Sequence, residues 1–287
     1  MKQVIKEEGL NVPIKMWADN IEDSAMEQAR HLASLPFAFH HIALMADAHT
    51  GFGMPIGGVL ATKGYVVFNA VGGDIGCGMN AVPTNIDIKD MAYPIVQDIF
   101  KNLKARVPVG FSSHDKPSPD RTEMLEKELM PYSELIQPEI PKAVQQLGTL
   151  GGGNHFIELQ AGSDGKVWLM LHSGSRHLGQ VVNTYYNNLA KAVNKVFYSS
   201  IPKEWDLAFL PYDFTDGKGD PVAEYYLLDM DTAKDYAFLN RKVMMSEFQQ
   251  AVRDSHAFPD VEFGDMINIP HNFVELETHF GEQVGYR

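Results

Sequence analysis

The stretch that decides the fold of this 287-residue chain is Val71–Asn80, which reads Val-Gly-Gly-Asp-Ile-Gly-Cys-Gly-Met-Asn. It contains Cys77, the single cysteine of the chain, three residues after Asp74. Its glycines let the backbone turn sharply and approach another group without a Cβ in the way. A thiol and a carboxylate on one bent loop are typical of two ligands for one cation, and a thiolate favours zinc or another transition metal over Mg or Ca. The alternative interpretation is that Cys77 is a small buried apolar residue and the glycines only form a turn.

The composition is that of a globular protein, with 45% hydrophobic and 21% charged residues. A single cysteine excludes an intrachain disulfide, and we find neither a signal peptide at the N-terminus nor an apolar run long enough to span a membrane. We therefore expect a soluble cytoplasmic protein. The net charge of −13 argues against binding nucleic acid through a broad basic face. Bound divalent cations and a local basic groove remain compatible with a phosphate-bearing partner.

Around the central loop, apolar patterning predicts alternating strands and helices. In the N-terminal part we expect a strand near 14–17, a helix over 21–34, a strand over 41–46, a hairpin of strands 56–62 and 65–69 turning at Lys63-Gly64, a strand over 79–84 and a helix over 91–106. Beyond them we expect a surface loop over 107–120, helices within 121–147, a hairpin of strands 154–160 and 166–171, a helix over 176–197, an irregular segment over 199–230, a helix over 231–254 capped by Asp231 and a strand over 266–269. Because the two kinds of element interleave without a linker or repeat, we predict one α+β domain over residues 1–287.

Three histidines stand where predicted strands begin or end, namely His155, His172 and His271. Each one taken singly is more typical of a hydrogen-bonded structural histidine than of a ligand. Together with Asp74 and Cys77 they form five potential ligands in similar contexts, and neutral imidazole bound to a metal suits an apolar strand end. The ligands are spread over about 200 residues, whereas a finger-type structural zinc site uses close pairs. The spacing therefore favours a catalytic metal site.

Other chemistries fit the sequence less well. We find no Gly-x-x-x-x-Gly-Lys-Ser/Thr phosphate loop and no Gly-x-Ser-x-Gly nucleophile elbow. Cys77 with His155 is a candidate thiol hydrolase pair. The carboxylate of Asp74 would oppose formation of the thiolate, and this interpretation ranks low.

Five long motifs resemble the RtcB family of tRNA-splicing RNA ligases, in the order in which that family carries them. They read Met-Ala-Asp-Ala-His-Thr-Gly-Phe-Gly-Met-Pro-Ile-Gly-Gly (45–58), Val-Gly-Gly-Asp-Ile-Gly-Cys-Gly-Met (71–79), Leu-Gly-Gly-Gly-Asn-His-Phe-Ile-Glu (150–158), Leu-His-Ser-Gly-Ser-Arg-His-Leu-Gly (171–179) and Pro-His-Asn-Phe-Val (270–274). The resemblance implies an RtcB-like α+β fold, with mixed or antiparallel sheets flanked by helices around a central metal cleft.

The resemblance also implies an activity, in which an RNA 2′,3′-cyclic phosphate or 3′-phosphate end is joined to a 5′-hydroxyl end with GTP and two manganese ions. The implied partners are RNA, GTP and an archease-type activator. By resemblance, the metal ligands are Asp74, Cys77, His155, His172 and His271, with Cys77 bridging both ions. Residues matching positions near the guanine nucleotide are Asn154, Glu158 and Asn272, and residues matching the active-site Asp-x-His loop are Asp47 and His49.

The sequence departs from the family in two places. The first motif has Ala46 where the family usually has proline, and the chain ends at Arg287 without the His-Arg-Lys-Gly-type motif that carries the guanylate-accepting histidine. We therefore expect a chain that is incomplete at its C-terminus relative to the family, either a truncated piece or a natural short relative, in which metal binding persists and ligation is weak or absent. The alternative functions are a metal-dependent phosphoesterase and a non-catalytic RNA- or nucleotide-binding remnant.

Overall fold

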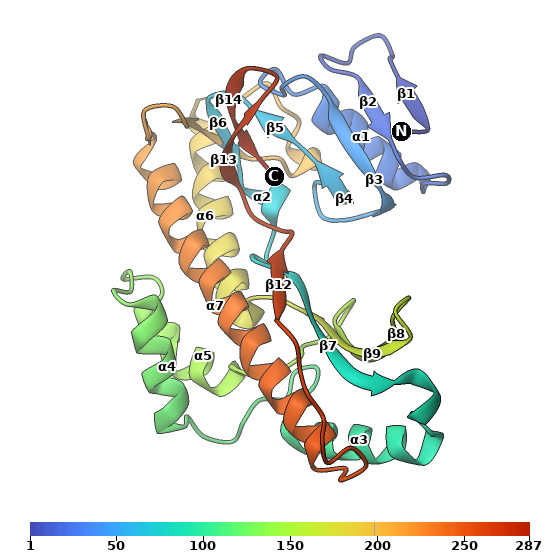
Figure 1. Ribbon diagram of the computed structural model, residues 1–287. Coiled ribbons are helices and arrows are strands. Elements are labelled where there is room, and N and C mark those ends of the chain that lie inside the picture. The colour runs from blue at the N-terminus through green and yellow to red at the C-terminus, as the bar shows by residue number, and fades with distance from the viewer. Residues whose placement is uncertain (198) are drawn as a thin grey trace. The chain divides into compact units, whose positions relative to one another are not determined.

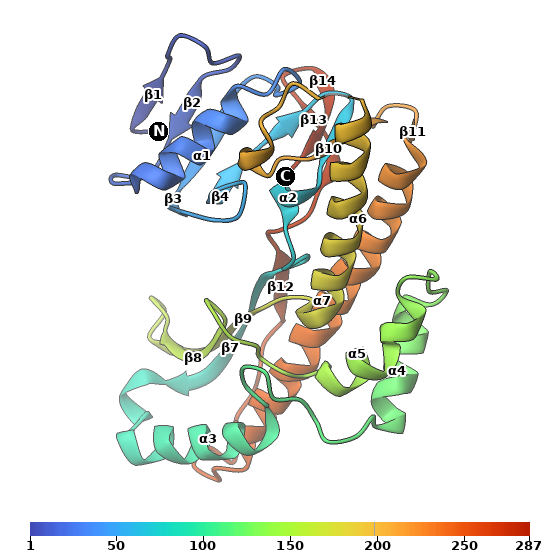
Figure 2. The ribbon, with the colours of Figure 1, turned by 180° about the vertical axis from the view of Figure 1, so that it is seen from behind.

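A computed structural model describes every residue except 198, and the chain divides into two compact units (Figures 1 and 2). Unit 1 comprises Met1–Gly73, Val181–Met230 and Phe273–Arg287, and unit 2 comprises Asp74–Gln180 and Asp231–Asn272. Both units mix helices with mainly antiparallel sheets, which confirms the predicted α+β class. Within the described residues no helix is long and apolar enough to cross a membrane.

Unit 1 contains three small sheets. Their strand orders are β1-β2-β3-β4, β11-β10-β6 and β13-β14-β5, and among the described residues of this unit only the β2–β3 pair is parallel. The strands are β1 (Gln3–Ile5), β2 (Ile14–Met16), β3 (Ile42–His49), β4 (Ile56–Val59), β5 (Ala61–Thr62), β6 (Tyr65–Val67), β10 (Phe209–Asp213), β11 (Lys218–Gly219), β13 (Glu275–His279) and β14 (Glu282–Tyr286). The helices are α1 (Asp23–Ala33), α2 (Phe68–Val71), the 3-10 turn η3 (Lys203–Trp205) and parts of the long helices α6 (Arg176–Val196) and α7 (Pro221–Arg253).

One buried cluster of unit 1 is apolar and includes residues of α1 and β3. Ala29, Leu32 and Ala33 follow helical spacing on α1, so that one stripe of the helix packs against Ile42 and Leu44 of β3 (Figure 2). Partly buried aromatic rings close the other side of this core, where Phe37 stacks on Tyr65 at 4.6 Å and meets Phe209 at 4.9 Å between ring centroids. Apolar burial is therefore the main source of stability in this unit.

Unit 2 is built on one four-stranded antiparallel sheet with the order β12-β7-β9-β8 (Figure 1). The strands are β7 (Gly78–Asp87), β8 (Phe156–Ala161), β9 (Lys166–Ser173) and β12 (Ile267–Pro270). The helical elements are α3 (Tyr93–Arg106), α4 (Pro119–Leu129), α5 (Ile140–Gln146), the 3-10 turns η1 (Ile88–Asp90) and η2 (Gln137–Glu139), and parts of α6 and α7.

Alternation along β9 explains which face of this sheet is covered. Val167, Leu169 and Leu171 are buried on one face and join a cluster with Leu103 of α3 and Phe248 of α7. Each fully buried Leu or Phe side chain contributes about 1.5–3 kcal/mol relative to an exposed one. The covered face fixes the register of the four strands, and this register places the strand ends described in the next section.

Three predicted elements are wrong. The expected hairpin over 56–69 does not form, because β5 pairs with β14 and β6 pairs with β10, while Phe68–Val71 is helical. The strand predicted over 41–46 continues to His49, so Asp47 lies in β3 and not in a loop. The segment 199–230 is not irregular throughout, since it holds β10, β11 and the first turns of α7, which begins at Pro221, ten residues before Asp231.

Candidate metal centre

Four polar side chains are placed at one edge of the unit 2 sheet by its strand ends. Cys77 precedes β7, His155 precedes β8, His172 is the penultimate residue of β9 and His271 follows β12. The register pairs His172 with Met79 and with Phe156, and the predicted hairpin over 154–171 is confirmed by that second pair. Because neighbouring antiparallel strands run in opposite directions, the starts of β7 and β8 meet the end of β9.

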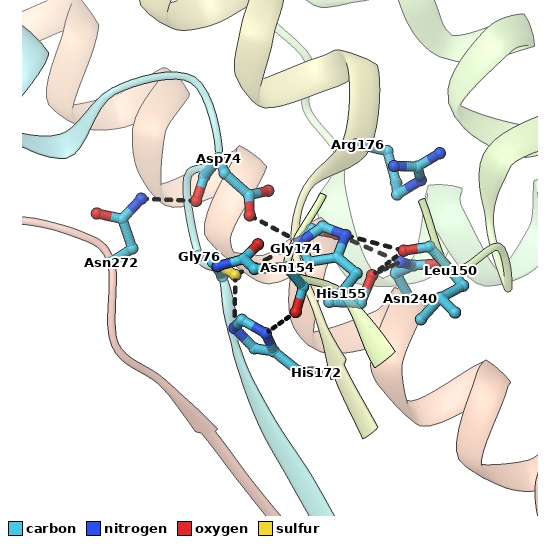
Figure 3. Close-up of polar contacts among 12 residues, drawn as sticks. Asp74, Gly76, Leu150, Asn154, His155, His172, Gly174, Arg176, Asn240 and Asn272 are labelled. Carbon is cyan, nitrogen blue, oxygen red and sulfur yellow. Dashed lines mark hydrogen bonds and ion pairs between the residues drawn. The ribbon is translucent and has the colours of Figure 1, made fainter. Parts of the chain in front are cut away.

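The rings of His155 and His172 lie close to the sulfur of Cys77, and Figure 3 shows the two rings together with Asp74. Sγ of Cys77 lies 3.0 Å from Nε2 of His172 and 3.6 Å from Nε2 of His155. Nε2 of His155 is 2.9 Å from Oδ2 of Asp74, and Nε2 of His172 is 3.1 Å from Nε2 of His271. The structure therefore brings all five sequence-predicted metal ligands together within unit 2.

The five residues form two overlapping candidate metal-binding groups. One is Cys77, His172 and His271, and the other is Asp74, Cys77 and His155. Within each group the ligand atoms all lie within 4.8 Å of one another. Cys77 belongs to both groups, so its sulfur lies within reach of the other ligand atoms of each.

The hydrogen bonds of Nδ1 in His155 and His172 show that Nε2 of each ring faces the centre. Nδ1 of His155 donates to the carbonyl oxygen of Leu150 at 2.9 Å, and Nδ1 of His172 donates to that of Asn154 at 3.0 Å (Figure 3). When Nδ1 of a neutral ring carries the proton, Nε2 presents a lone pair. Backbone carbonyls thus orient both rings with their acceptor nitrogens toward the sulfur, as in the outer contacts of metal-bound histidine.

Burial disfavours the charged forms of the Cys77 thiol and the His172 ring. It raises the pKa of the Cys77 thiol, and the negative charge of Asp74 raises that pKa further. Burial also lowers the pKa of His172. For Asp74 burial is the largest single influence and would raise the pKa, but the contacts with His155, Cys77 and His172 together outweigh it, and the carboxyl pKa is lowered. A bound cation would reverse the effect on the thiol, because a coordinating thiol is deprotonated outright.

The loop between Asp74 and Cys77 is held in shape by backbone contacts. The Cys77 amide donates to the Asp74 carbonyl at 3.1 Å, and the His271 amide donates to the Cys77 carbonyl at 2.8 Å. Asn272 donates from its side chain to the Asp74 carbonyl at 2.7 Å. A Cβ on Gly174 would lie 2.1 Å from Oδ1 of Asp74, so only glycine leaves room for the carboxylate there.

Arg241 is a contributor that the sequence prediction missed. This α7 residue is fully buried, and its Nη1 donates to the carbonyls of Gly76 at 2.6 Å and Ser173 at 2.9 Å, while its Nε donates to Oδ1 of Asn268 at 2.7 Å. The guanidinium therefore joins the segment before β7, the last residue of β9 and β12. Burial lowers the pKa of Arg241 to about 10, which leaves it charged at neutral pH behind the Cys77 loop.

Its neighbour Asn240 acts in the same way on the glycine loop before β8. Asn240 Oδ1 accepts from the amides of Gly148 at 2.8 Å and Thr149 at 3.2 Å, and Nδ2 donates to the carbonyls of Thr149 and Gly174, both at 3.2 Å. Asn240 and Arg241 continue the apolar stripe of α7 at helical spacing from Ala237 and Met244. Two polar residues inside such a stripe were the signal that could have revealed them.

The remaining predicted site residues are placed as follows. Asn154 is exposed and contributes its carbonyl to His172, while Glu158 lies on β8 and accepts from Gln160. Asp47 and His49 belong to unit 1, where both are exposed on β3, and the ring of His49 contacts the carbonyl of Asp47 at 2.8 Å. Their spacing of two puts both on the same face of the strand.

Comparison with known proteins gives a consistent result over almost the whole chain. The family model described as "tRNA-splicing ligase RtcB" matches residues 28–134 and 128–285. The "RNA-splicing ligase RtcB" of Escherichia coli K12 is 34% identical over 96% of this chain and 70% of its own length. The "tRNA-splicing ligase RtcB" of Aeropyrum pernix is 28% identical over 94% of this chain and 66% of its own length, and that of Thermococcus kodakarensis is 26% identical over 94% and 65%. The chain thus spans about two thirds of the length of these relatives, and it belongs to the RtcB family.

Proposed function

We propose that this chain carries out the RNA ligation of its family, joining a 2′,3′-cyclic phosphate or 3′-phosphate RNA end to a 5′-hydroxyl end. The proposed cofactors are two manganese ions and GTP, and the proposed partners are RNA and an archease-type activator. One observation supports the proposal above all others: four side chains, three of them from distant parts of the sequence, converge on Cys77 in two overlapping ligand groups.

The donor set fits divalent cations. Without a cation, the lone pair on Nε2 of His172 faces the ring nitrogen of His271 at 3.1 Å and the sulfur of Cys77 at 3.0 Å. Atoms that present lone pairs to one another at these distances repel unless a proton or a cation lies between them. Thiolate, imidazole and carboxylate together suit first-row transition metals. Manganese is proposed among these ions because of the family resemblance.

Each residue has a proposed place in this arrangement. His172 and His271 would hold one ion, Asp74 and His155 the other, and Cys77 both. Two such ions supply electrostatic stabilisation of the negative charge that builds up on phosphate oxygens during displacement.

The chain's own polar groups would then bind and orient the reactants. Asn154, Glu158 and Asn272 are the proposed contacts for the guanine nucleotide, and Asp47 and His49 the proposed active-site pair from β3. Asn272 already uses its amide to hold the Asp74 carbonyl, so its proposed contact with the nucleotide would involve the other end of the side chain. We place the reaction in the cytoplasm, because a cysteine ligand must stay reduced to bind metal.

Metal analysis of the purified protein tests the site directly. We expect bound transition metal in the wild type and loss of at least half of it in Cys77→Ala, since Cys77 belongs to both ligand groups. The matched control is His256→Asn, which alters an exposed histidine of unit 2 outside the two groups and tolerates the positive φ of 53° at that position. Unchanged metal content in Cys77→Ala would contradict the proposed centre.

End joining is tested with an RNA whose 3′-phosphate already carries a guanylate, so that joining requires no guanylate-accepting histidine. We expect a joined product with a 5′-hydroxyl RNA that depends on Mn²⁺ and is absent in His172→Ala. Release of phosphate without joining would favour a metal-dependent phosphoesterase. Metal binding with neither reaction would overturn the ligase proposal and leave a binding protein.

A further inference from the structure

Unit 1 contains a cavity of about 330 Å³ at the C-terminal end of α6, distinct from the ligand groups of unit 2. This volume lies at the lower end of the 300–1,000 Å³ that is typical of small-molecule sites, about the size needed for one nucleotide-like group. Its apolar lining includes Ala192, Ile201, Pro202, Leu207 and Ala208. Its charged lining consists of Lys191, Lys195, Lys203 and Asp206.

The wall of the cavity is preformed by hydrogen bonds within unit 1. The side chain of Asn194 on α6 donates to the carbonyl of Phe209 at 2.7 Å and accepts from its amide at 3.1 Å, which fixes the helix to the start of β10. Asp206 accepts from Nδ2 of Asn69 at 2.7 Å and pairs with Lys191 at 2.5 Å. The one lining carboxylate is therefore already neutralised by a lysine.

The two other lining lysines keep their positive charge available. Lys195 and Lys203 are both exposed, and neither forms an ion pair with a carboxylate in the part of the chain that the structure describes. The nearest acid in sequence, Glu204, does not line the cavity. The opening thus combines an apolar interior with two ammonium groups at its rim.

The sequence around this cavity is exceptional for so acidic a protein. The chain has 37 Asp and Glu residues, yet within unit 1 none occurs between residues 181 and 203, a segment that carries Lys191, Lys195 and Lys203. A net charge of −13 repels phosphate over most of the surface, so a local cationic segment is where a polyanion can approach. Charge complementarity therefore selects an anionic ligand for the cavity.

We propose that this cavity is a subsite for single-stranded RNA, in which one base or ribose enters the apolar interior while flanking phosphates contact Lys195 and Lys203. Proteins bind single strands in this way, with cationic groups along the backbone and apolar or aromatic surfaces against the bases. The inference rests on the proposed function, since that function makes RNA the substrate. The subsite would hold a part of the RNA that is separate from the ends that react.

Binding of a fluorescent, unstructured 12-nucleotide RNA, measured in EDTA over a range of salt concentrations, tests the subsite without the metal centre. We expect Lys195→Ala/Lys203→Ala to bind about tenfold more weakly and to reduce the slope of log K against log salt by about 1.4, because each phosphate contact on a single strand contributes about 0.7. The matched control is Lys6→Ala/Lys218→Ala, which removes the same charge from unit 1 residues that do not line the cavity. It should bind like the wild type.

A second variant separates the cavity from a merely cationic surface. Ala192 is exposed on the cavity wall, so Ala192→Trp fills the opening with little cost to folding. We expect weaker RNA binding with an unchanged salt slope. The subsite is overturned if Ala192→Trp binds RNA like the wild type, or if the lysine pair and its control behave alike. Failure of the wild type to bind any RNA would instead count against the proposed function itself. The variant Lys195→Ala/Lys203→Ala should keep the metal content of the wild type, because neither lysine belongs to the ligand groups of unit 2.

Discussion

The two units of this chain use their buried polar side chains differently. The cluster at the centre of unit 1 is wholly apolar, from Ile14 on β2 to Leu207 before β10. Unit 2 has an apolar cluster as well, but beside it lie the fully buried polar residues Asn240 and Arg241 and the ring of His172, which is 6% exposed. Buried polar groups stabilise a fold only when every partner is in place. Unit 1 also buries polar groups, such as Asn69, Asn183 and Asp229. In unit 2, however, the buried polar residues hydrogen-bond to the segments that carry the candidate metal ligands.

Replacing Arg241, whose guanidinium is buried in unit 2, should have the largest effect on stability. Arg241→Met leaves two backbone carbonyls and the Asn268 oxygen without their donor, and loss of one partner from a buried charged network costs about 3–5 kcal/mol. We expect this loss in the free energy of unfolding of unit 2, measured by urea denaturation with hydrogen exchange to localise it, together with loss of bound metal.

The apolar core of unit 1 supplies the control for that variant. Leu44→Ala removes a fully buried side chain and should cost about 2–5 kcal/mol in unfolding free energy. Metal content in the folded protein should nevertheless stay at the wild-type level. If both variants lost metal equally, Arg241 would have only a general structural role.

Removing the metal itself should have a smaller effect, confined to unit 2. A ligand that binds only the folded state adds about 2.7 kcal/mol when its concentration is 100 times its dissociation constant. Chelation should therefore accelerate amide exchange around Gly78 and His172 and leave the amides of α1 unchanged. Equal acceleration in both units would show that the ligand groups of unit 2 are not where the stabilising ion binds.

The same contrast explains how far the sequence alone could predict the structure. The convergence of the candidate ligands was predictable because four of the five stand beside or within a short apolar run that forms a strand as expected. Arg241 was missed because its partners Gly76, Ser173 and Asn268 lie 27 to 165 residues away, a separation that no local pattern connects. Local spacing thus identifies the candidate ligands and not the residues that hydrogen-bond to the segments carrying them.

The errors in unit 1 have a different physical cause. Lys63-Gly64 resembles a hairpin turn, but Thr62 pairs with Gly285 and Tyr65 pairs with Pro211, so long-range pairing separates the two strands. Asp231 resembled a helix cap, yet the cap is Asp220, whose carboxylate accepts the Val222 amide at 2.9 Å. In both places tertiary contacts overrode a local signal.

The smallest expected effect concerns pH and unit 1. Burial, followed by the nearby charges of Lys15, His40 and His279, lowers the pKa of His41 from 6.5 to about 4. Because the folded pKa lies below the unfolded one, the unfolded chain binds the extra proton, and stability present above pH 6.5 is lost progressively as the pH falls toward 4. The ring is partly exposed, so solvent screening reduces the contribution.

Comparing the urea midpoint of His41→Gln with that of the wild type between pH 7.5 and pH 4 isolates this residue from the other histidines, since only the difference between the two curves is used. The difference in urea midpoint between the two proteins should become smaller in acid. His41→Gln should bind metal like the wild type at neutral pH, because His41 belongs to unit 1 and the ligand groups belong to unit 2. Parallel curves would mean that His41 titrates alike in both states, and that acid acts on unit 1 through other groups.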